Sequence, residues 1–272
     1  MTPTSGMPFH WALNPYRGCT HACAYCYARK YQHHLELGAG DDFSSLILVK
    51  VNLPHVLARE VERASWPRET VAIGTATDPY QPIEGHYQLT RQCAARLAEA
   101  RTPFSIVTKG PMVVRDVDVF QRATRGAGCE ILVSVPTVDD EAWQRLEPGA
   151  APPRQRLRAA QQLTEAGIET GVLMMPLVPG ISTSRSSVER TLEAIRATGA
   201  RFVGANVARF DPVVREHFFT FLAREYPGLV AGYERLYSNT SATPAYVRAV
   251  NTMVDQVAVK VGLRESIPRP GC

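Results

Sequence analysis

Long apolar segments are missing from this sequence. No apolar run reaches the roughly eighteen residues that a membrane-spanning helix needs, so we expect no membrane partner and no span. The first residues, Met1 to Gly6, contain neither a basic stretch nor an apolar one, and we therefore expect no secretory signal. Together these absences predict a cytoplasmic protein.

Long runs of positive charge are also absent. The chain has 30 Lys and Arg against 26 Asp and Glu, a formal net charge of +4, and no five basic residues stand in a row. Such a mildly basic balance is compatible with a nucleic-acid partner but does not require one. Spread along helices, the arginines are expected on solvated faces.

Cysteine is scarce, with six in 272 residues, and three of the six are clustered. A disulfide framework needs more cysteines in a shorter chain, so the cluster indicates a metal site in a reducing compartment. Cys93 and Cys129 fall in a helical pattern and at a strand start, where a small buried hydrophobe is expected. Cys272 is terminal and receives no role.

The clustered thiols are Cys19, Cys23 and Cys26, and they follow a segment that Pro15 and Gly18 make a turn or loop. On a loop, sulfurs this close in sequence can converge, and converging thiolates bind soft metals. A 4Fe-4S cluster normally takes four cysteines, one per iron. Three local thiols therefore leave one iron open for chemistry.

The spacing C-x3-C-x2-C, with Tyr25 before and Tyr27 after the third cysteine, resembles the signature of the radical S-adenosylmethionine (SAM) superfamily. The resemblance implies a 4Fe-4S cluster whose open iron chelates S-adenosyl-L-methionine. It further implies that one electron cleaves SAM to a 5'-deoxyadenosyl radical, which abstracts a hydrogen atom from a substrate. An external one-electron reductant such as flavodoxin or ferredoxin is implied as a partner.

Two alternatives to a cluster stay open for the thiols. They are buried structural cysteines, or a zinc site completed by His21, His33 or His34. Zinc ligands usually come as C-x2-C pairs with a second pair further on, and neither a second C-x2-C nor an H-x3-H occurs here. The alternative to an enzyme is thus a non-catalytic iron-sulfur or zinc-binding module associated with nucleic acid.

Apolar segments alternate with amphipathic ones along most of the chain. We expect strands at residues 8–13, 70–74, 104–108, 130–135, 168–174 and 201–207, and a further apolar, β-branched stretch at 46–51. We expect helices at 27–37, 54–64, 89–100, 113–124, 139–146, 153–166, 184–198, 213–224 and 244–261. This α/β alternation predicts a parallel sheet with right-handed crossovers.

Six βα units are too few for a closed TIM barrel, which has eight. Six do match the partial (β/α)6 TIM-like barrel that the radical SAM family uses. We expect this core to occupy residues 1–225, with residues 226–272 forming a C-terminal helical extension that packs on the barrel.

Ligands of parallel βα folds bind at the carboxyl ends of the strands. The second strand is followed by Gly-Thr-Ala-Thr-Asp-Pro-Tyr-Gln, a polar stretch that resembles the spore photoproduct lyase-like branch of the superfamily. This resemblance implies that Thr77 and Asp78 contact SAM, and that Thr75 replaces a cysteine that donates a hydrogen atom. A hydroxyl does that job poorly, which counts against repair of a thymine lesion. DNA or another nucleotide stays open as the substrate.

Later strand ends carry further candidates. The resemblance implies that Lys109 contacts SAM and that Ser134 bonds its ribose or carboxylate. Met175 lies on an apolar platform suited to an adenine face, and Arg209 is placed to reach an anionic substrate.

The segment of Glu147, Arg154 and Arg156 resembles one in the lyase-like branch and is expected at the active-site rim or at helix caps. The predicted cofactor-binding residues are Tyr25, Tyr27, Thr75, Thr77, Asp78, Lys109, Ser134, Met175 and Arg209. The predicted cluster ligands, and through the cluster the catalytic residues, are Cys19, Cys23 and Cys26.

Overall fold

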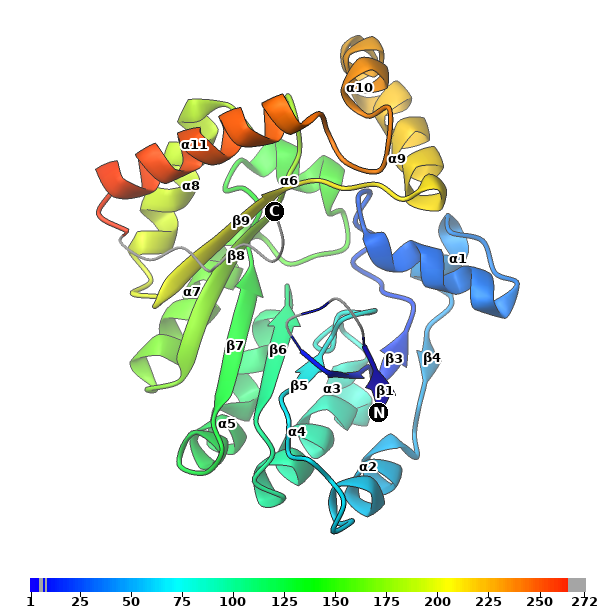
Figure 1. Cartoon of the computed structure of the whole chain (residues 1–272), viewed down its shortest axis with the longest axis vertical. Helices are drawn as coiled ribbons and strands as arrows, with labels where there is room; N and C mark the ends of the chain where they lie inside the picture. The colour runs from blue at the N-terminus through cyan, green and yellow to red at the C-terminus, as the bar shows by residue number, and fades with distance from the viewer. Residues whose placement is uncertain (5–6, 8, 264–272) are drawn as a thin grey trace.

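A curved parallel sheet forms the centre of the computed structural model, which describes residues 1–4, 7 and 9–263 (Figure 1). Its parallel strands are, in spatial order, β2 (Trp11–Leu13), β5 (Val71–Ile73), β6 (Phe104–Thr108), β7 (Cys129–Ser134), β8 (Glu169–Leu177) and β9 (Phe202–Val207). The short β1 (Thr2–Pro3) adds to β2 in antiparallel orientation. Within the described residues, β1 and β9 are the two edges and the barrel is not closed.

Helices cover the sheet and connect its strands. The longer ones are α2 (Leu53–Val61), α4 (Leu89–Glu99), α5 (Val117–Thr124), α7 (Pro153–Glu165), α8 (Arg185–Arg196), α9 (Pro212–Glu225) and α11 (Pro244–Lys260). The others are the 3-10 helices η1 (Tyr27–Leu35), η2 (Pro111–Asp116) and η3 (Pro227–Leu229) and the short helices α1 (Asp41–Ser45), α3 (Glu84–Tyr87), α6 (Asp140–Leu146) and α10 (Val230–Leu236). Side chains of Asp139, Ser184 and Asp211 cap α6, α8 and α9 by accepting a hydrogen bond from the backbone.

The core lies between the sheet and these helices. All three residues of β5 are buried, and the buried residues of β6 alternate, as expected where a strand packs apolar side chains on one face. The helices α5 and α7 pack on β7, α7 packs on β8, and α11 packs on β9 and α8. The blue segment that leads to α1 and carries the cysteines lies to the right of the sheet in Figure 1.

The predicted partial barrel of six parallel strands is confirmed, with several local differences. The helix expected at 113–124 is divided into η2 and α5. The stretch 46–51 contributes only β4 (Leu48–Val49), which pairs with β3 (Tyr16–Arg17) in a separate antiparallel sheet. The expected helix at 27–37 is a 3-10 helix that ends at Leu35. The strand expected to end at 174 continues to Leu177, so Met175 lies inside β8.

The C-terminal helices extend the fold beyond the last strand. α11 packs on the edge strand β9, and α10 lies beside α9 (Figure 1). The boundary at residue 225 stays a prediction, and residues 264–272, with Cys272, lie outside the described residues. In the part of the chain that the structure describes, no helix combines the length and apolarity needed to cross a membrane.

Candidate functional site

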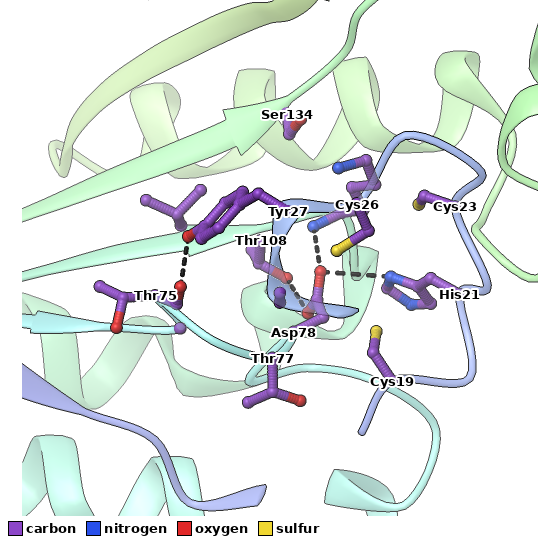
Figure 2. Close-up of a pocket in the computed structure, with 14 residues that line it drawn as sticks. Cys19, His21, Cys23, Cys26, Tyr27, Thr75, Thr77, Asp78, Thr108 and Ser134 are labelled. Carbon is purple, nitrogen blue, oxygen red and sulfur yellow. Dashed lines mark hydrogen bonds and ion pairs between the residues drawn. The ribbon is translucent and has the colours of Figure 1, made fainter. Parts of the chain in front are cut away.

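The loop between β3 and η1 brings the three thiols to the carboxyl ends of β5, β6 and β7. There they border a cavity of about 110 Å³. Figure 2 shows the three sulfurs arranged around one space, with Asp78 and His21 beside it. The cavity is lined by Cys19, His21, Cys23, Cys26, Tyr27, Ala28, Gly74, Thr75, Thr77, Asp78, Val107, Thr108, Lys109 and Ser134.

Backbone contacts hold the cysteine loop from two sides. The Cys19 amide donates to the carbonyl of Phe43 (2.8 Å), while the Ala24 amide donates to the carbonyl of Leu146 (2.9 Å). Gly149 approaches so closely that a Cβ there would lie 2.0 Å from the carbonyl oxygen of Thr20. Segments before β4 and after α6 therefore fix the loop that carries the thiols.

Arg29 ties the loop together from within the fold. Its side chain is buried and donates to the carbonyls of Ala22 (3.0 Å), Cys23 (3.1 Å), Ala39 (2.8 Å) and Gly40 (3.0 Å). Ala22 has a left-handed backbone with φ of 53°, a conformation that costs energy for a residue with a side chain. The guanidinium of Arg29 thus stabilises the turn at Ala22, whose backbone conformation is unfavourable by itself.

Asp78 is a buried acceptor at the end of the loop after β5. Its carboxylate accepts from the hydroxyl of Thr108 (2.6 Å) and from the amides of Lys109 (2.6 Å) and Tyr80 (2.9 Å), and His21 Nδ1 lies 3.3 Å away. Burial by itself would raise the pKa of Asp78, but the neighbouring His21 and these hydrogen bonds outweigh it and hold the pKa well below its usual range. The carboxylate therefore stays charged and fixes His21 at the cavity wall.

Glu147 is the second buried carboxylate, and it lies behind the cysteines. It accepts from the hydroxyl of Tyr25 and from Arg156 Nη2, and Lys109 Nζ lies 3.8 Å from Oε1. Burial favours the neutral acid, yet Arg156 and Lys109 together lower the pKa of Glu147. The expected rim position is wrong for Glu147 and Arg156, because both are buried in the interior. Glu147 is, however, the C-cap residue of α6, where its amide donates to the carbonyl of Trp143 (2.8 Å). Arg154 is exposed.

Burial raises the pKa of all three thiols. The pKa of Cys23 rises to about 12, although the nearby Lys109 acts against the shift. That of Cys19 rises well above its usual value, with the charge of Asp78 as the next cause after burial. The thiols thus hold their protons at neutral pH until a metal displaces them.

The structure brings together most, but not all, of the predicted cofactor-binding residues. Tyr27, Thr75, Thr77, Asp78, Lys109 and Ser134 line the cavity with the cysteines. Three predicted residues do not line it: Tyr25 is buried behind it, Met175 accepts a hydrogen bond from Ser134 through its carbonyl (3.3 Å), and Arg209 is exposed on a backbone bridge to Ser241. Their roles stay predictions.

Three of the lining hydroxyl-bearing residues connect the turn after β5 to the segment that carries the cysteines. Thr77 donates to the carbonyl of Gly18 (2.5 Å), just before the first thiol, and Thr75 accepts from the side chain of Asn14 (3.0 Å). Tyr27 donates to the carbonyl of Thr75. These bonds join the turn after β5 to the cysteine loop on both sides of the thiols.

His21 and Thr108 line the cavity, and the sequence does not identify either as a cofactor-binding residue. The sequence suggests His21 only as a zinc ligand, although its place between the first two cysteines is a signal that it shares their site. His33 and His34, the other possible zinc ligands, are exposed and away from the cavity wall.

The donor set suits an iron-sulfur cluster. Three thiols are soft ligands, and a cluster binds each thiolate on a different iron, so the sulfurs need to border one space rather than meet at a point. Among the described residues, no three His, Cys, Asp or Glu side chains are close enough to hold a single metal ion. The cysteine arrangement therefore fits a cluster with a ligand position left over.

Comparison with models of known protein families identifies the family of this chain. The model of the radical SAM superfamily matches residues 13–195. The chain belongs to the radical SAM superfamily. Members of this family use a 4Fe-4S cluster and SAM, and they need an external reductant.

Two relatives show how similar in sequence this radical SAM protein is to other proteins. An uncharacterised protein of Mycobacterium tuberculosis is 36% identical over 244 residues, covering 90% of this chain and 72% of the relative. A protein of Pseudomonas phage M6, named radical SAM Nalpha-GlyT isomerase, is 29% identical over 197 residues, covering 70% of this chain and 37% of the phage protein.

Solved structures share the fold. A variant of spore photoproduct lyase superimposes with a TM-score of 0.71 at 16% identity, covering 96% of this chain and 77% of the lyase. Another variant of that lyase, with bound SAM and a dinucleoside spore photoproduct, gives a TM-score of 0.67 at 17% identity, covering 93% and 74%. The resemblance to the lyase-like branch is thereby confirmed at the level of the fold.

Proposed function

We propose that this chain is an enzyme that binds a 4Fe-4S cluster through Cys19, Cys23 and Cys26 and uses SAM to abstract a hydrogen atom from a substrate. The observation that carries the proposal is the shared cavity, in which the three thiols face the ends of β5, β6 and β7. Membership of the radical SAM superfamily supports the same chemistry.

When bound, the reduced cluster supplies one electron that breaks the sulfur–C5' bond of SAM, giving methionine and a 5'-deoxyadenosyl radical that takes a hydrogen atom from the substrate. The protein's own residues position SAM and neutralise its charged groups. Lys109, on the cavity wall, is suited to pair with the SAM carboxylate. Thr75, Thr77 and Ser134 offer hydroxyl groups, and Asp78 holds the end of β6 in place.

The remaining predicted contacts complete the proposal. Tyr25 and Tyr27 flank the third thiol, and Tyr25 acts through Glu147 rather than at the cavity surface. Met175 and Arg209 are candidates for the adenine face and for an anionic group of the substrate. A flavodoxin or ferredoxin of a reducing cytoplasm is the proposed electron donor.

For the substrate we propose DNA or a nucleotide. Support comes from the similar lyase structures, three of which hold a dinucleoside spore photoproduct. Thr75 argues against a reaction that ends with hydrogen donation by a thiol at this position. Gel-shift binding to single- and double-stranded oligonucleotides at low salt tests the class, because phosphate contacts are strongest there. Absence of binding at low salt would discard nucleic acid as the substrate.

The enzyme proposal is tested by anaerobic reconstitution with iron and sulfide, followed by dithionite and SAM. We expect a brown protein that forms 5'-deoxyadenosine. Single replacements C19A, C23A and C26A should abolish the product, whereas C129A, which removes a buried thiol outside the cavity, should retain it. A colourless protein that retains zinc would instead favour the non-catalytic module. A brown wild type that yields no SAM cleavage product would reject the enzyme.

A further inference from the structure

Arg29 differs from the other buried cations near the cavity. Arg156 and Lys109 both pair with the carboxylate of Glu147. Arg29 is only 2% exposed, yet no carboxylate oxygen of the described residues forms an ion pair with it. All of its hydrogen bonds go to backbone carbonyls, including those of Ala22 and Cys23.

Carbonyl dipoles satisfy the donors of a guanidinium but carry no net charge. A buried ion without a counter-ion is costly, and folded proteins usually pair it. The buried charge of Arg29 would therefore be stabilised by an anion, and no carboxylate of the described residues lies close enough to form that ion pair.

Arg29 lies directly against the cysteine loop. Its Nε donates to the carbonyl of Cys23 (3.1 Å), and its Nη2 donates to the carbonyl of Ala22 (3.0 Å), which lies between the first two thiols in the sequence. Phe43 covers the guanidinium at 4.9 Å and packs in one cluster with Cys19 and Cys26. The arginine and the sulfurs thus share one poorly solvated compartment.

We propose that Arg29 is the built-in counter-cation of the iron-sulfur cluster, offsetting the negative charge of the cysteine thiolates and so favouring cluster retention and a higher reduction potential. The inference rests on the proposed function, since it needs a cluster at the three cysteines. Reduction adds an electron, and a nearby positive charge stabilises the reduced state more than the oxidised one. Arg29 acts as a positioning residue, because it works through its field and through the carbonyls of the loop.

The test compares R29K, which keeps the charge, with R29M, which removes it. The matched control is K30Q, which removes one positive charge from the next residue, where the ammonium is 41% exposed and pairs with Asp211 at 3.7 Å. Each protein is reconstituted anaerobically, its iron and sulfide are measured, and its midpoint potential is determined by redox titration followed by EPR.

We expect R29M to shift the reduction equilibrium at least tenfold towards the oxidised cluster, which is about 59 mV for one electron. R29K should recover most of that shift, and K30Q should match the wild type because water screens its charge. A cluster that forms in R29K but not in R29M also supports the proposal. Two results would overturn the proposal and restrict Arg29 to shaping the loop. One is a wild-type midpoint potential in both R29K and R29M, and the other is failure of both variants to fold or to load the cluster. A wild type without a cluster would instead reject the proposed function.

Discussion

The hydroxyl of Tyr25 donates a hydrogen bond to the carboxylate of Glu147, a residue 122 positions further along the chain. This bond connects the cysteine loop to the segment after α6. Glu147 in turn pairs with Arg156, which donates to the carbonyl of Ser134 at the end of β7 (3.0 Å). The position of the thiols therefore depends on a buried network of charges that reaches the carboxyl end of β7.

Replacing Glu147 by Ala should strongly destabilise the protein. The change leaves the guanidinium of Arg156, which is 0% exposed, buried without its counter-ion. Breaking one side of such a pair costs about 3–5 kcal/mol. Urea unfolding of the cluster-free protein measures the loss. The control is E141A, which breaks the exposed ion pair with Arg145 and should cost below about 1 kcal/mol. Equal losses in the two variants would contradict the network.

Replacing Gly149 by Ala should displace the cysteine loop. The added Cβ would meet the carbonyl oxygen of Thr20 at 2.0 Å, and its next neighbours are also backbone atoms of Thr20 and His21, which cannot move aside as a flexible side chain could. We expect a loss of about 1–3 kcal/mol in unfolding free energy and less iron bound per chain after reconstitution. G232A, in α10 where a Cβ meets nothing within 4 Å, should be neutral or stabilising by about 0.5–1 kcal/mol. Full iron loading in G149A would show that the loop tolerates the shift.

His217 should make the protein sensitive to acid. Burial and then the charge of Arg29 lower its pKa to about 4, below the usual value of 6.5. As the pH falls from 6.5 to 4, the unfolded chain takes up a proton that the folded protein does not, so the unfolding free energy decreases in that window and levels off below it. Above about pH 7 the residue has no such effect.

The measurement is chemical unfolding at several pH values for the wild type and H217N. The variant should lose less stability than the wild type between pH 6.5 and 4, by on the order of 1–2 kcal/mol, since the ring is partly exposed. Identical pH profiles of the two proteins would show that His217 takes up its proton as readily in the folded state as in the unfolded one.

The sequence predicts the fold well where local pattern and packing agree. The strands at 104–108, 130–135 and 201–207 are found close to their predicted bounds, because each is a short stretch rich in apolar and β-branched residues. The stretch 46–51 has the same composition but pairs with β3 outside the main sheet. Its composition indicates a strand, but composition alone does not specify which strand it pairs with.

The site is predictable at the thiols and less so behind them. Spacing identifies Cys19, Cys23 and Cys26, since all three ligands lie within one short loop. The partners of Glu147 come from three distant segments, so no local pattern shows that this residue is buried rather than at the rim. The burial of Arg29 is equally hard to predict from the sequence. A helical arginine is usually solvated, and only the fold shows that the charge of this one is enclosed.

The most direct measurement is the EPR spectrum of the dithionite-reduced, reconstituted protein with and without SAM. Three thiols that hold four irons leave one iron to which SAM can bind. We therefore expect close to four irons and four sulfides per chain and a cluster signal that changes its g values when SAM is added. A well-loaded cluster whose spectrum is unaffected by saturating SAM would contradict an open iron at this site, and with it the proposed chemistry.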